Sequence, residues 1–228
     1  MLKFKKGMEM KRIKDFLNKH MSFILATLIS LLFVILALVY ILWNYYYRYT
    51  HYSYDSHQEL ELAYWKCKSE VVDEISDYMN KKVSYHNLSA LVILNACDKY
   101  GIDVRLPLSQ GLIESHYGTC GLASKTNSVF NMGAFDGNKL DKILKIHKYT
   151  HPNQSVEPYL SKLRTSYLGD SKTEQDLLNE FVTLSGRRYA SYDKYERELK
   201  IIWDDINSTT RLDSLLDVYR FLKVELNR

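Results

Sequence analysis

A long run without charged residues constrains the fold of this chain more than any other feature. No charged residue occurs from Met21 to Tyr47, and Leu, Ile, Val, Phe and Ala dominate from Phe23 to Trp43. About 20 apolar residues in a helix span the ~30 Å hydrocarbon core of a bilayer. A core helix of a soluble protein would need burial on every side over this length. We therefore predict one transmembrane helix at residues 21–43, which contacts the lipid bilayer.

The charges that flank this run predict its orientation. Residues 1–20 carry seven Lys or Arg residues against two acidic ones. Basic segments stay on the cytoplasmic side, and aromatic residues favour the membrane interface. We predict a cytoplasmic basic tail at 1–20, an interfacial stalk at 44–58 and an extracytoplasmic domain at 59–228, which makes a single-pass membrane protein. A cleavable signal peptide is the alternative, but it needs a shorter apolar region and a cleavage site with small residues.

The composition excludes several classes of protein. With 46 % hydrophobic and 25 % charged residues, 9 Gly and 3 Pro, the chain is neither collagen-like nor disordered. The net charge is +4, and because the basic tail alone carries +5, the remaining residues carry −1. A nearly neutral domain does not favour nucleic acid as a partner.

Cysteine and histidine spacing predicts no metal site and no cofactor. Cys67, Cys97 and Cys120 are odd in number and lack the C-x-x-C spacing of a zinc ribbon. His147 and His151 are four residues apart, but no Glu follows His147 as in a zinc-binding helix. At most one disulfide can form, and we expect at least one free buried thiol.

Apolar residues at helical spacing predict a mainly α domain after the stalk. Helices are expected near residues 59–79, 88–100, 108–116, 155–167, 177–182, 192–206 and 212–226. Gly101 is expected to end the second helix, and Thr173 with Asp176 to form a capping box. The segment 118–152, richer in Gly, Asn and Asp, is expected to be a cleft-forming irregular or β-hairpin insertion. The apolar stripe of 212–226 is expected to pack on the domain.

One carboxylate stands out because its neighbours are apolar. Glu114 follows Leu112 and Ile113 at the end of a predicted helix. Burial there should raise the pKa of the carboxyl group. A carboxylic acid that stays protonated near neutral pH can protonate the leaving oxygen of a sugar. Taken alone, a carboxylate such as Glu114 is more often a structural residue that caps or pairs within the helices.

Three short motifs follow one another in the second half of the chain. They are Glu-Ser-His-Tyr-Gly at 114–118, Asn-Ser-Val-Phe-Asn-Met at 127–132 and Arg-Tyr-Ala-Ser-Tyr-Asp-Lys-Tyr at 188–195. In order and spacing they resemble the glucosaminidase domain of bacterial and phage peptidoglycan hydrolases, glycoside hydrolase family 73 with its Bax-type members, in the lysozyme-like superfamily. That family has Glu-Ser-Gly-Trp-Gly, Asn-Asn-Leu-Phe-Gly-Ile and Tyr-Ala-Thr-Asp. The likeness covers roughly residues 85–206.

The resemblance implies a lysozyme-like α-helical fold and an endo-β-N-acetylglucosaminidase that acts on peptidoglycan glycan strands. Glu114 takes the position of the general acid, and Tyr117 replaces the Trp in the wall of the sugar cleft. Phe130 and Tyr189 match aromatic positions at the site, although packing beneath the cleft is the commoner role of the Phe. Asn131 replaces a Gly, and Asn tolerates positive φ better than most residues.

The second catalytic carboxylate is less clear from the sequence. The family often supplies it from the segment after the Phe motif, where Asp136, Asp141 and Glu157 are available. We predict Asp136, although it also fits a turn, and assistance by the acetamido group of the substrate needs no second carboxylate. Asp193 lies one residue beyond the family pattern and is expected to cap the following helix.

Two other functions remain open from the sequence. A lytic transglycosylase on the same scaffold also needs one acid, and it forms an anhydro sugar instead of taking up water. A non-catalytic wall-binding or assembly protein would keep the cleft without turnover. The sequence predicts no oligomeric state.

Overall fold

The computed structural model describes residues 10, 14–16, 23, 25, 28–44, 57–133 and 145–228. The chain divides into two units, Met1–Ser56 and His57–Arg228. In the first unit, residues 28–44 are helical. Among the residues described, no helix combines the length and apolar character needed to cross a bilayer. The predicted span at 21–43 lies only partly within these residues.

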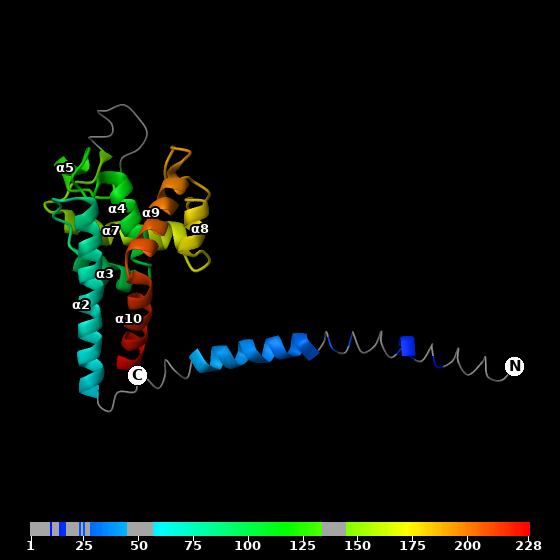
Figure 1. Cartoon of the computed structure of the whole chain (residues 1–228). Coiled ribbons are helices and arrows are strands. Elements are labelled where there is room, and N and C mark those ends of the chain that lie inside the picture. The colour runs from blue at the N-terminus through cyan, green and yellow to red at the C-terminus, as the bar shows by residue number, and fades with distance from the viewer. Residues whose placement is uncertain are drawn as a thin grey trace. The chain divides into compact units, whose positions relative to one another are not determined.

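The second unit is built from helices (Figure 1). The longer ones are α2 (His57–Lys82), α3 (Ala90–Tyr100), α4 (Arg105–Ser115), α9 (Tyr195–Thr209) and α10 (Leu212–Leu226). The shorter ones are α5 (Ala123–Thr126), the 3-10 helix η1 (Pro152–Ser155), α7 (Val156–Lys162), the π-helix η2 (Leu163–Leu168) and α8 (Glu174–Asn179). The prediction of a mainly α domain is confirmed, and the architecture is consistent with a lysozyme-like fold.

Of the two alternatives predicted for 118–152, an irregular or a β-hairpin insertion, the described part is irregular. That part contains the short helix α5 and turns, and residues 134–144 lie outside the described residues. β-type pairing within the described chain is limited to a bridge between Val182 and Arg188. It belongs to a hairpin-like turn at residues 181–189. Backbone hydrogen bonds close this turn: the Thr183 amide donates to the Arg187 carbonyl, and the Tyr189 amide donates to the Phe181 carbonyl.

Helices α2 and α10 lie side by side and run in opposite directions (Figure 1). The rings of Tyr64 and Tyr219 stack between them with centroids 5.4 Å apart. Leu212, Leu216 and Leu222 on α10 are buried. The prediction that the apolar stripe of 212–226 packs on the domain is confirmed.

Capping residues in the sequence predicted two helix ends correctly. Gly101 ends α3 in the left-handed conformation, with φ 60°, and Thr173 and Asp176 form the predicted capping box of α8. Other ends differ from the prediction. Helix α2 begins at His57, so the last two residues of the predicted stalk are helical. Lys194, rather than Asp193, is the N-cap of α9, and its side chain makes no capping hydrogen bond.

Helix α4 runs through the core and carries the candidate acid at its end. Leu106, Leu108, Gln110 and Gly111 are all buried, and α4 packs against α9. Because the body of α4 is enclosed, its C-terminal residues are held in a fixed place relative to the rest of the domain.

Candidate active site

The C-terminus of α4 is held by a polar side chain and by an unusual backbone. The Ser115 hydroxyl donates to the Val129 carbonyl at 2.6 Å and accepts from the Gly118 amide at 2.8 Å. His116 and Tyr117 both have positive φ, 46° and 57°, a conformation that L-residues rarely adopt. Gly111 permits this turn, because a Cβ there would lie only 3.1 Å from the Tyr117 ring. These contacts fix the end of the helix and with it the position of Glu114.

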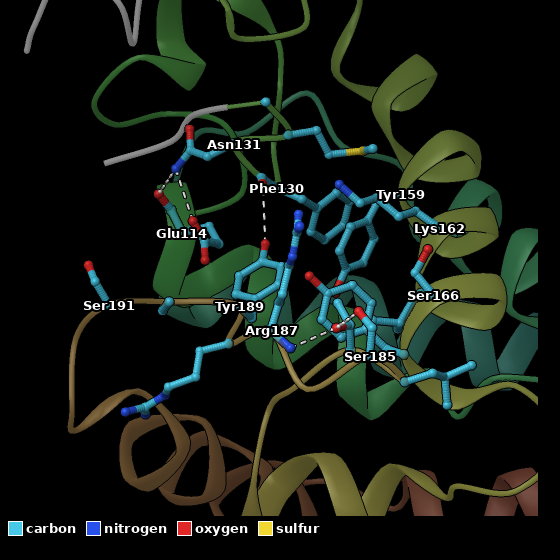
Figure 2. Close-up of a pocket in the computed structure, with 18 of the residues that line it drawn as sticks. Glu114, Phe130, Asn131, Tyr159, Lys162, Ser166, Ser185, Arg187, Tyr189 and Ser191 are labelled. Atoms are coloured by element: carbon cyan, nitrogen blue, oxygen red, sulfur yellow. Dashed lines mark hydrogen bonds between the residues drawn. The ribbon is translucent and has the colours of Figure 1, made fainter. Parts of the chain in front are cut away.

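Two neutral donors hold the carboxyl group of Glu114. The Asn131 amide donates to the Glu114 carbonyl at 2.7 Å and to Oε2 at 3.1 Å, as Figure 2 shows. The Tyr195 hydroxyl, at the start of α9, donates to Oε1 at 3.1 Å and accepts from the Gln110 side chain at 3.0 Å. Asn131 has φ 47°, so the left-handed conformation expected where the family has Gly is confirmed.

Burial raises the pKa of Glu114 above its usual value. Hydrogen bonds from Asn131 and Tyr195 favour the carboxylate and offset part of this effect. The Tyr189 hydroxyl also lowers the pKa of Glu114, and it donates to the Phe130 carbonyl at 3.2 Å. The net upward shift agrees with the expectation drawn from Leu112 and Ile113, and it favours the proton-carrying form.

Glu114 opens into a pocket of about 890 Å³, within the size range of small-ligand sites. Phe130 and Tyr159 form part of its lining and stack almost in parallel, with ring centroids 3.8 Å apart. Tyr189 lies nearby and meets the Tyr195 ring at 5.3 Å between centroids. The lining also includes hydroxyl and basic side chains: Ser166, Thr183, Ser185, Ser191, Lys162, Arg187 and Arg188.

The structure brings most of the predicted site residues together. Phe130, Asn131 and Tyr189 line the same pocket as Glu114. Tyr117 does not line it: its ring is 1 % exposed and packs edge-on against His86, with centroids 5.7 Å apart. The positive φ of Tyr117 turns its side chain back onto Gly111, which places it in the core and not in the predicted cleft wall.

Glu114 is the only carboxylate among the described residues that line the pocket. Glu157 lines a different groove and pairs with Lys99. Asp136, the predicted second catalytic residue, and Asp141 lie outside the described residues. Within the described chain, no three His, Cys, Asp or Glu side chains gather as a metal site would require. Cys67 and Cys97 are free and buried, as expected of at least one cysteine, and Cys120 is free and exposed.

Several residues of the site were not predicted from the sequence. Gln110 and Tyr195 support the acid, and Tyr159, Lys162 and Arg187 line the pocket. Tyr195 has a signal in the sequence, because it ends the third motif. The others come from α4, α7 and the 181–189 turn, and nothing in their local patterns shows that these elements converge.

A carboxyl group with a raised pKa, held by neutral donors beside aromatic rings in a pocket, is the arrangement expected of a glycoside hydrolase. The sequence profile of the Glucosaminidase family, described as mannosyl-glycoprotein endo-beta-N-acetylglucosaminidase, matches residues 90–208, just over half of the chain. The chain belongs to this family and is a glycosidase of the endo-β-N-acetylglucosaminidase type, as the three motifs indicated. A search of curated proteins finds no match.

Proposed function

We propose that this protein cleaves an N-acetylglucosaminyl bond in peptidoglycan with Glu114 as the general acid. The observation that carries the proposal is the Glu114 carboxyl group, which is held toward its protonated form at one side of an aromatic-lined pocket. A proton on this group can be given to the leaving sugar oxygen as the bond breaks.

The groups around Glu114 support both of its protonation states. Once the proton has left, the carboxylate still accepts hydrogen bonds from Asn131 and Tyr195, and bonds to a charged acceptor are the stronger ones. The half-buried Tyr189 ring, in the pocket lining, offers an apolar face to a sugar, whereas the Tyr159 ring is buried and stacks on Phe130. The Tyr159 hydroxyl and Asn131 Oδ1 are buried without a partner among the described residues.

We place the enzyme at the outer face of a membrane, with residues 21–43 as a single anchor and the N-terminus in the cytoplasm. The uncharged run and the basic tail support this topology. Peptidoglycan is then the N-acetylglucosamine polymer that the domain meets. This favours the bacterial wall over the mannosyl-glycoproteins of the family's description.

A lytic transglycosylase is the second candidate, because the described lining of the pocket contains a single carboxylate. Such an enzyme closes an anhydro ring within the substrate and needs no carboxylate to activate water. A hydrolase needs a second group, and Asp136 remains our prediction for it unless the substrate's acetamido group assists.

The test compares the full-length protein in detergent with Glu114→Gln on purified peptidoglycan. We expect the release of sugar ends to fall by roughly 10²- to 10⁴-fold, the usual contribution of a general acid. Glu157→Gln is the matched control, because it changes an exposed carboxylate in another groove, and it should keep full activity. Equal rates for the wild type and Glu114→Gln would refute the proposal.

Product masses decide the reaction type in the same experiment. A hydrolase gives reducing ends, whereas a transglycosylase gives anhydro ends. If Asp136 is the second carboxylate, Asp136→Asn should lose as much activity as Glu114→Gln.

A further inference from the structure

Two basic side chains in the pocket have no role in holding the acid. Lys162 is the last residue of α7, and Arg187 belongs to the 181–189 turn. Figure 2 shows both side chains extending from these elements into the pocket. Neither makes a side-chain ion pair or hydrogen bond with another described residue. Arg188, by contrast, is bound to Glu196, at 3.1 Å.

The charges of the described part of the pocket lining do not balance. Glu114 is the only carboxylate of the described lining. Burial holds it toward the neutral form, against the opposing effect of its hydrogen-bond donors, and no cation is among the causes of the shift. Lys162 and Arg187 therefore leave the described pocket with a net positive charge. Because the chain beyond the basic tail carries −1 in total, this local excess is not a reflection of the average surface.

We propose that Lys162 and Arg187 bind a carboxylate of the substrate, so that the enzyme prefers an acidic glycan to a neutral one. This inference rests on the proposed function. The planar guanidinium of Arg187 fits a carboxylate with two parallel hydrogen bonds, and the ammonium of Lys162 adds a point charge from the other wall. The hydroxyls of Thr183 and Ser185, 3.0 Å apart, lie in the same lining and supply further donors.

Peptidoglycan carries carboxylates in two places that satisfy this chemistry. Where the peptide is attached, the carboxylates belong to the peptide. Where it has been removed, the lactyl group of each muramic acid residue has a free carboxylate. The shared chemistry is a carboxylate beside an N-acetylglucosaminyl bond, and the arms of the experiment distinguish the two sources.

The experiment measures KM and kcat of the full-length wild type, Lys162→Gln and Arg187→Gln on three substrates. These are glycan strands with peptide, strands freed of peptide, and peptide-free strands whose carboxyl groups have been converted to amides. We expect each variant to raise KM about tenfold on an acidic substrate, with little change in kcat. On the amidated strands the wild type and the variants should have the same KM. The source is the peptide if the variants lose affinity only when peptide is present, and the lactyl group if they lose it on the peptide-free strands.

Three controls separate this inference from the proposed function. Lys200→Gln removes an exposed cation on α9 outside the pocket and should match the wild type. Arg187→Lys keeps the charge and should recover part of the affinity. If the variants and the wild type have equal KM values on all three substrates, the inference is refuted while the glycosidase activity stands. If Glu114→Gln is as active as the wild type, the proposed function itself fails.

Discussion

Two part-buried carboxyl groups of this domain have opposite pKa shifts, because only one of them has cationic partners. Burial alone would raise the pKa of Asp103, but the hydrogen bonds and charges of Arg105 and Arg220 outweigh burial and lower it. Glu114 receives only neutral donors, so burial prevails and its pKa is raised. Asp103 is thus neutralised by two arginines, whereas Glu114 has no cationic partner among the causes of its pKa shift.

Replacing Tyr195 with Phe should move the alkaline limb of the pH–activity profile to higher pH. The Tyr195 hydroxyl donates to Glu114 and so favours the carboxylate. Without it, the pKa of Glu114 rises further, and the protonated acid persists to higher pH. The profile of kcat/KM against pH reports this group in the free enzyme. The Gln110 side chain also loses a partner, which should cost about 1–3 kcal/mol of stability.

Tyr192→Phe is the control for this prediction. Tyr192 lines the same pocket, but its hydroxyl donates to Glu198 and not to Glu114. This variant should keep the alkaline limb of the wild type. A shift to lower pH in Tyr195→Phe would contradict the assignment of Glu114 as the acid.

At the level of single residues, the sequence could single out Glu114 as a carboxyl group with a raised pKa, but not the residues that surround it in the pocket. Glu114 could be predicted because apolar neighbours and a short motif mark it within a few positions. Tyr117 shows the limit of a motif: the aromatic residue is present, but its backbone conformation turns the ring into the core. Lys162 and Arg187 are part of the pocket only because α7 and the 181–189 turn meet there, which no local pattern specifies.

At the level of elements, a helix could be predicted where an apolar period or a capping residue determines its bounds. The prediction is less accurate where tertiary contacts determine where a helix begins or which type of helix forms. Helix α4 begins at Arg105, three residues before the predicted start. Pro107 lies in its first turn, where the missing amide hydrogen costs no helical bond, so the helix can extend further back. The π-helix Leu163–Leu168 has no signal in the sequence, although it continues from α7 beside the pocket.

The pairing of α10 with α2 gives a prediction about stability. Leu216 is buried in the α10 stripe, and α10 supplies none of the described pocket lining. Leu216→Ala should therefore lower the free energy of unfolding by about 2–5 kcal/mol while the activity of the folded fraction stays unchanged. Unfolding in urea, together with the specific activity below the transition, checks both parts.

Val224→Ala provides the matched control on the same helix. Val224 is 53 % exposed, so its truncation should change stability by no more than about 0.5 kcal/mol. Equal losses in the two variants would mean that the stripe of α10 does not pack as described.

At the level of the whole molecule, two units with different surfaces are joined in one chain. The second unit buries its apolar residues in a core of its own. Along the helix of residues 28–44 in the first unit, large apolar side chains are exposed throughout, including Leu31, Phe33 and Leu42. A helix that is apolar on every side needs a covering environment, and the basic residues before it suit the cytoplasmic face of a bilayer. We expect lipid to provide that cover.

The proposed anchor predicts how the protein is distributed between the membrane and the soluble fraction. Full-length protein should stay in the membrane pellet after washing at high salt and high pH, because the apolar helix is held by hydrocarbon and not by charge. A chain beginning at His57 keeps the second unit, including the described pocket, and should appear in the soluble fraction with an unchanged kcat on soluble glycan oligomers. Ile35→Arg in the full-length chain should impair insertion, because an arginine near the middle of the span costs about 2.5–3.5 kcal/mol. Recovery of the full-length wild type in the soluble fraction would contradict the anchor.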